Sequence, residues 1–117
     1  MSGLSNKKDF VLEISEHHLY PKLLLQIKKD FELTGIQINI DQQTSPQNLI
    51  EIISQSVYQL LHNHFDTFMQ LLYRIDISEH LMSSDTVDSA ENVTQKATFE
   101  IIKREWQKVQ WREKFSQ

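Results

Sequence analysis

In one stretch of the chain, apolar residues recur at helical spacing and would cover most of the circumference of a helix. Between residues 46 and 74 the apolar side chains recur every three or four positions. Thr44-Ser45-Pro46 begins this stretch with two residue types that cap helices and a proline suited to the first helical position. A helix that is apolar on so many sides lies centrally in its fold. The pattern predicts a long central helix over residues 46–74, either unbroken or bent near Asn63–Asp66.

Two further helices are expected, one on each side of this stretch. Residues 21–33 have apolar positions three and four apart, and Gly35 behind them suits a left-handed residue that ends a helix. A last helix is expected over residues 86–115, after a break at Ser83-Ser84-Asp85. Short connections favour antiparallel neighbours. The fold class predicted is mainly α, as a three-helix antiparallel bundle with a long central helix.

Two short stretches alternate between apolar and polar positions, which is the period of extended chain. They are residues 10–14 and residues 36–40. The second stretch could be a short strand paired with the first, or a loop whose three isoleucines lie on the bundle. A two-stranded sheet is marginal alone and would need the helices behind it. We therefore expect residues 1–20 to be partly extended and leave a minor two-stranded element open.

Composition narrows the classes of protein to which the chain can belong. Its 117 residues predict a single domain over residues 1–117. Cysteine is absent, which excludes disulfides and cysteine-ligated zinc, and the two glycines form no phosphate-binding loop. No apolar run exceeds three residues, so no membrane span is expected. The first ten residues lack the apolar core of a secretory signal, which makes the cytoplasm the expected location.

Charge is distributed unevenly along the chain. The net charge is −4, from 12 basic and 16 acidic residues. Residues 76–91 contain five acidic residues and no lysine or arginine, and we expect them to form an acidic linker. Residues 96–117 contain six basic residues against three glutamates. An acidic segment followed by a basic one indicates internal charge pairing or an oppositely charged partner.

The histidines are candidates for metal ligands, and together with the carboxylates Asp76 and Glu79 they are candidates for acid–base chemistry. His62 and Asp66 are four residues apart and would share a face of the central helix. They supply at most two ligands, and a third would have to come from His17, His18 or His80. The spacing matches no known zinc or di-iron motif. A structural pair is therefore expected here, with a metal-dependent or acid–base enzyme as the alternative, and no cofactor or catalytic residue is predicted.

The last helix contains more aromatic residues than a small core needs. Trp106 falls on its apolar stripe, whereas Trp111 and Phe115 lie four apart on another face. Basic residues alternate with these aromatics, a composition that binds protein partners, nucleic acid or a membrane surface. The acidic net charge argues against nucleic acid. The candidate interaction residues are Trp111, Phe115, Lys108, Arg112 and Arg104, and a nucleic-acid site would use Lys103, Arg104, Lys108 and Arg112.

Two runs of this sequence resemble segments of small bacterial proteins that have no assigned activity. The runs are residues 71–79 and residues 104–110. The resemblance implies a bacterial, cytosolic protein and carries no mechanism. The sequence as a whole favours a non-enzymatic protein-interaction or self-associating module rather than an enzyme. Its partner would be a second copy, most simply in a two-fold dimer, or another protein.

Overall fold

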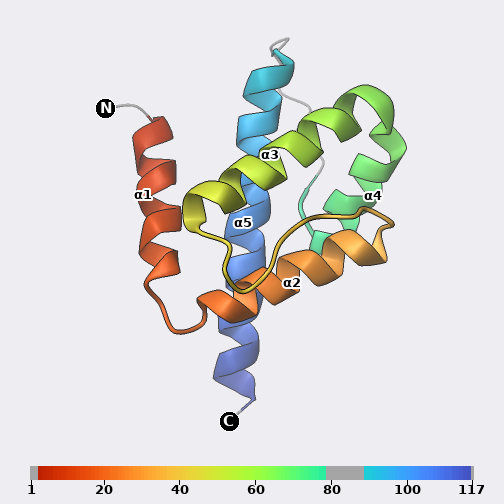
Figure 1. Ribbon diagram of the computed structural model, residues 1–117. Coiled ribbons are helices and arrows are strands. Elements are labelled where there is room, and N and C mark those ends of the chain that lie inside the picture. Colours follow the sequence, from red (N-terminus) through yellow and green to blue (C-terminus); the bar gives the residue numbers. More distant parts are fainter. Residues whose placement is uncertain (1–2, 79–88, 117) are drawn as a thin grey trace.

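The computed structural model describes residues 3–78 and 89–116, and of residues 3–8 it describes the backbone alone. The prediction of a mainly α protein is confirmed (Figure 1). The three-helix bundle is wrong, because the described residues form five helices and no strand. None of the described helices is long and apolar enough to cross a membrane. The helices are α1 (Gly3–Ser15), α2 (Tyr20–Leu33), α3 (Pro46–Asn63), α4 (Phe65–Ile75) and α5 (Ala90–Phe115).

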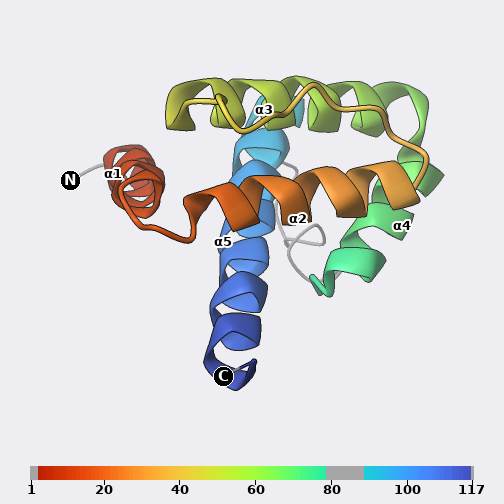
Figure 2. The same ribbon diagram turned by 60° about the horizontal axis from the view of Figure 1, so that its bottom comes forward.

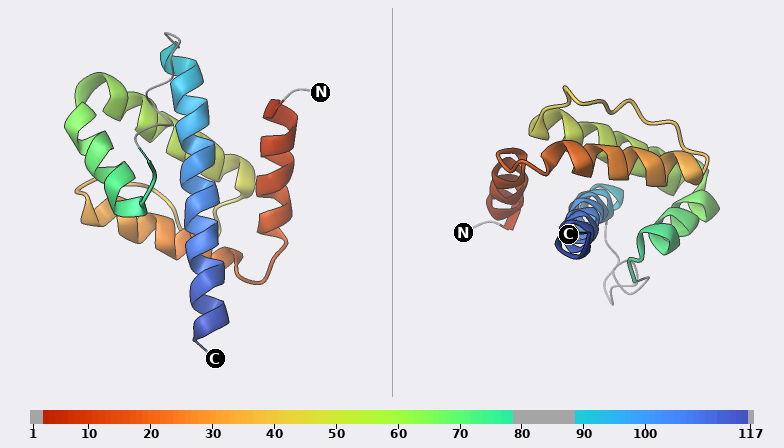
Figure 3. Two further views of the ribbon diagram at one scale, coloured as in Figure 1. Left: turned by 180° about the vertical axis from the view of Figure 1, so that it is seen from behind. Right: turned by 90° about the horizontal axis from the view of Figure 1, so that it is seen from below.

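The helix α5 is the axis on which the other helices pack. It contacts α2, α3 and α4, and its most extensive contact is with α3. Helices α2 and α3 both cross α5 on the same side, and α1 and α4 flank it (Figure 3). The helices α2 and α3 run in the same direction, and residues 34–45 carry the chain back between them (Figures 1 and 2). The expected antiparallel order fails here because that connection is long enough to return across the molecule.

Residues 10–14 are helical, so the prediction that they are extended is wrong. They belong to α1, where Val11 and Ile14 are three positions apart and buried, while Leu12 is 54% exposed. Phe10 packs edge-on against Phe99 of α5, with ring centroids 5.5 Å apart. The apparent alternation arose because Leu12, an apolar residue, lies on the outer face of a helix.

Residues 36–40 are extended and have no strand partner among the described residues. Ile36, Ile38 and Ile40 are buried, and the polar residues between them are exposed. The interpretation of this segment as a loop with its isoleucines on the bundle is confirmed, and the two-stranded element is absent from the described residues. Gly35 precedes the segment with φ of +86°, as its position after α2 predicted.

The stretch over residues 46–74 is two helices rather than one. Ser45 caps α3 by accepting a hydrogen bond from the backbone N–H of Asn48 at 3.2 Å, and Pro46 occupies the first turn. The helix ends at Asn63, His64 adopts non-helical angles, and α4 begins at Phe65. The bend lies within the range that the sequence indicated. This break turns α4 back toward α2 and α5, with both of which it is in contact.

The last helix begins at Ala90, with Ser89 accepting a hydrogen bond from the Asn92 N–H at 3.2 Å. The expected start at residue 86, and most of the acidic linker over residues 76–91, lie outside the described residues. The interior between the helices is mainly apolar. Its largest fully buried side chains are Phe31, Phe68, Leu23, Leu24, Ile27, Ile40, Leu49, Ile53, Leu71, Leu72, Ile75 and Ile101.

Candidate interaction surface

The C-terminal end of α5 projects beyond the other helices (Figures 1 and 2). It carries two exposed aromatic side chains. Trp111 is 66% exposed and Phe115 is 63% exposed. Their ring centroids lie 4.6 Å apart with the planes inclined at 46°. Trp106 on the neighbouring face is buried. The aromatic residues of α5 thus divide into one that fills the core and two that form an apolar contact pair in water.

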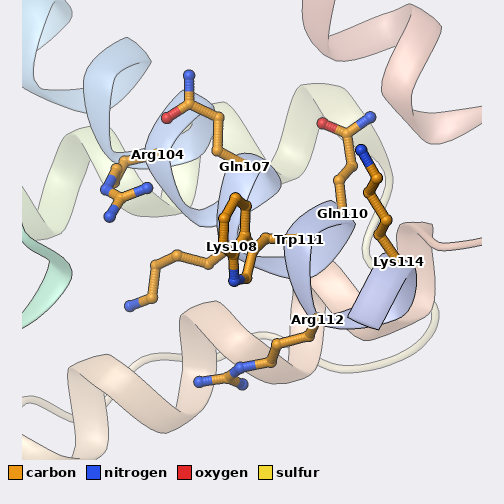
Figure 4. Close-up of a pocket in the computed structure, with 7 residues that line it drawn as sticks. All are labelled: Arg104, Gln107, Lys108, Gln110, Trp111, Arg112 and Lys114. Atoms are coloured by element: carbon orange, nitrogen blue, oxygen red, sulfur yellow. The ribbon is translucent and has the colours of Figure 1, made fainter. Parts of the chain in front are cut away.

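Basic side chains surround Trp111 on the surface of α5. A hollow of about 700 Å³ runs along this helix, and Figure 4 shows Trp111 among the side chains that line it. Among the described residues, four cations and no carboxylate occur in this lining. The hollow is lined by Arg104, Gln107, Lys108, Gln110, Trp111, Arg112 and Lys114. We call this lining together with Phe115 the aromatic–basic face.

Two of these cations are paired with carboxylates of the same chain. Arg104 donates to Asp76 Oδ2 at 3.0 Å, and Lys108 donates to Asp30 Oδ2 at 2.9 Å. Arg112 donates to the side-chain amide of Gln26. Within the described residues, no carboxylate is paired with Arg112 or Lys114. The uncompensated positive charge of the face is therefore concentrated at the projecting end of α5, beside the exposed aromatics.

A buried polar cluster joins α2 to α5 behind this face. Gln26 and Asp30 come from α2, and Glu105 and Lys108 come from α5. The amide of Gln26 donates to Asp30 Oδ2 at 2.9 Å. Lys108 Nζ lies 3.1 Å from Glu105 Oε1, but the approach is off the line of a hydrogen bond. Both carboxyl oxygens of Glu105 are thus buried without a hydrogen-bond donor among the described residues.

A proton on Glu105 explains this arrangement. Burial raises the pKa of Glu105 to about 9, and the neighbouring Asp30 carboxylate acts in the same direction. The pKa of Asp30 is lowered despite its burial, because hydrogen bonds from Glu105, Lys108 and Gln26 stabilise its charged form. Near neutral pH the cluster is therefore a neutral Glu105 that donates to an ionised Asp30, with Lys108 as the counterion.

Sequence reasoning missed this cluster, although a signal was present. Glu105 is four residues from Ile101 and four from Val109, so it lies on the apolar stripe of α5. Asp30 lies three residues after the buried Ile27 and so belongs to the buried face of α2. In the charge count of residues 96–117, Glu105 is one of three glutamates set against six basic residues. A carboxylate at a core position of one helix predicts a cation or a second polar group on the helix that faces it.

The histidines do not converge in the described structure. The helix that would have placed His62 and Asp66 on one face ends at Asn63, so the reasoning from a four-residue spacing fails. His62 Nδ1 instead lies 2.8 Å from the carbonyl oxygen of Tyr58. His17 and His18 stack on each other between α1 and α2, with ring centroids 4.6 Å apart.

Neither the grouping of the described side chains nor the comparison with known proteins points to a ligand. Among the described residues, no three histidine, aspartate or glutamate side chains are grouped so that they could hold a metal ion. The candidate ligand His80 lies outside these residues. Comparison of the chain with family models, with curated proteins and with solved structures finds no match.

Proposed function

We propose that this chain is a non-enzymatic interaction module that associates with a second copy of itself through the aromatic–basic face of α5. The observation that carries the proposal is the exposed pair Trp111 and Phe115, with rings 4.6 Å apart on the projecting end of the helix. A buried tryptophan or phenylalanine contributes roughly 150–250 Å² of contact area. Tryptophan and arginine are also the residue types that most often dominate the binding energy of protein interfaces.

The internal pairing of the other cations supports protein rather than nucleic acid as the partner. Arg104 and Lys108 are engaged by Asp76 and Asp30, so they are less available to a phosphate backbone. An interface centred on aromatic side chains with two cations at its rim depends mainly on apolar contact. We therefore expect association that weakens less with salt than binding to nucleic acid would.

Light scattering coupled to size-exclusion chromatography tests the proposal. We expect the wild type to elute above its monomer mass of 13.9 kDa. The double variant Trp111→Ala, Phe115→Ala should elute as a monomer. The matched control is Tyr73→Ala on α4, since Tyr73 is 87% exposed and lies outside the proposed face. The control should retain the wild-type mass. A monomeric wild type at high concentration would overturn the proposal.

A further inference from the structure

A second hollow, with lining of the opposite charge, lies between α1 and the start of α3. Its volume is about 710 Å³. Asp9 and Glu51 supply two carboxylates, Leu12 and Ile50 supply apolar surface, and no cation occurs among the described side chains of the lining. These side chains are Asp9, Leu12, Ser45, Pro46, Gln47, Ile50, Glu51 and Ser54. We call it the acidic hollow.

The acidic hollow complements the projecting end of α5 in charge and in polarity. The projecting end carries Arg112 and Lys114, which have no carboxylate partner among the described residues. The hollow carries Asp9 and Glu51, which are exposed and have no cation partner among the described residues. The projecting end also presents the exposed Trp111 and Phe115, and the hollow presents the exposed Leu12. One molecule therefore carries both halves of a complementary contact.

These two surfaces lie in different parts of the molecule, so one copy cannot join them. The acidic hollow belongs to α1 and α3, whereas the C-terminal end of α5 points away from both of these helices (Figure 1). A second copy can join them. We propose that the end of α5 in one copy docks into the acidic hollow between α1 and α3 of the next copy, in a head-to-tail contact. This inference rests on the proposed function and specifies its geometry.

Electrostatics argue against the two-fold alternative. A symmetric contact between two aromatic–basic faces would place Arg112 and Lys114 against the same cations of the second copy. Like charges facing each other across an interface disfavour association. The head-to-tail contact instead places them against Asp9 and Glu51. Each copy then contacts one neighbour through its α5 end and another through its acidic hollow. Association therefore continues into a ring or an open chain of copies.

A mixing experiment distinguishes the two geometries. The first protein carries Trp111→Ala and Phe115→Ala, which removes the aromatic pair. The second carries Leu12→Lys and Glu51→Lys, which blocks the hollow at two exposed positions that the core does not use. Its matched control is Glu32→Lys with Leu33→Lys, the same pair of substitutions at exposed positions on α2. Circular dichroism of each protein checks that all of them are folded.

We expect each blocked protein to be monomeric by light scattering, and the control to associate as the wild type does. An equimolar mixture of the two blocked proteins should contain a species of twice the 13.9 kDa monomer mass, because each retains one working surface. A hollow-blocked protein that still associates like the wild type would overturn the head-to-tail geometry and leave the proposed function standing. A mixture that stays monomeric would also overturn it. A wild type that is itself monomeric would overturn both.

Discussion

Replacing Lys108 with methionine removes the cation that holds the Asp30 carboxylate inside the protein. Lys108 Nζ lies 2.9 Å from Asp30 Oδ2 and 3.1 Å from Glu105 Oε1. Removing one partner of a buried ion pair leaves an uncompensated charge and destabilises a protein by about 3–5 kcal/mol. The Lys108 side chain retains some contact with water, and Glu105 can still donate its proton to Asp30. We therefore expect Lys108→Met to lower the free energy of unfolding by about 3 kcal/mol, the lower end of this range.

Replacing Glu105 with glutamine should have a much smaller effect. The side chain of Glu105 is 0% exposed, and at neutral pH we infer that it is uncharged. Glutamine has nearly the same shape, is neutral, and can donate an amide N–H toward Asp30 in place of the acid proton. The expected loss in the free energy of unfolding is under about 1 kcal/mol, the usual size of one exchanged hydrogen bond.

Urea unfolding at neutral pH, followed by circular dichroism, measures both losses. With a slope of about 1.5 kcal/mol per molar urea, Lys108→Met should lower the midpoint by about 2 M. The matched control is Lys103→Met, the same substitution at an exposed position of α5, with an expected effect within about 0.5 kcal/mol. If Glu105→Gln destabilises as much as Lys108→Met, Glu105 is ionised and the reasoning is refuted.

Two further predictions concern pH and one backbone position. The pKa of Glu105 is raised from 4.5 to about 9, so the folded protein holds a proton that the unfolded chain releases. The free energy of unfolding should therefore fall as the pH rises across this interval, by at most about 1.4 kcal/mol per pH unit. Urea midpoints measured against pH should fall less steeply in Glu105→Gln than in the wild type. An equal fall in both proteins would contradict the proton on Glu105. Gly35→Ala should lower the free energy of unfolding by about 1 kcal/mol, because the left-handed backbone is strained for alanine. The added methyl group has nothing within 4 Å, so a much larger loss in a thermal melt would count against this account.

Local signals predicted the ends of helices well. Pro21, Gly35 and the Ser45-Pro46 pair act on their own backbone, and the structure places them at the start of α2, after its end and at the start of α3. Such residues satisfy or remove hydrogen-bonding groups within one turn, so their effect depends little on the rest of the fold.

Long-range arrangement was beyond the same reasoning. Periodicity over residues 10–14 indicated extended chain because it assigned Leu12 to the core, and only the packing of the folded protein shows that Val11 is the buried residue. The shared direction of α2 and α3 depends on the path of residues 34–45, which short-connection rules do not describe. The exposed Trp111 and Phe115 were singled out correctly as lying off the core stripe, but their role in association stays a prediction.

The buried charges show a different limit. The sequence pattern counts Lys108 among the candidate surface residues and Glu105 among the charges of its segment, since these residue types are almost never buried without partners. The partner that makes burial tolerable, Asp30, is distant in sequence and comes into reach only after α2 and α5 pack. A pair of this kind is predictable only when two helix faces are considered together.

The extended segment Ile36-Gln37-Ile38-Asn39-Ile40 has a consequence for the unfolded chain. It alternates β-branched residues with amides and contains no charge, glycine or proline, the composition typical of segments that stack into cross-β fibrils. In the folded protein its isoleucines are buried against the helices, so these side chains cannot contact other molecules. Asp41 follows directly and places a charge at one end of the segment. We therefore expect partial unfolding that releases this segment to increase the tendency of the chain to aggregate.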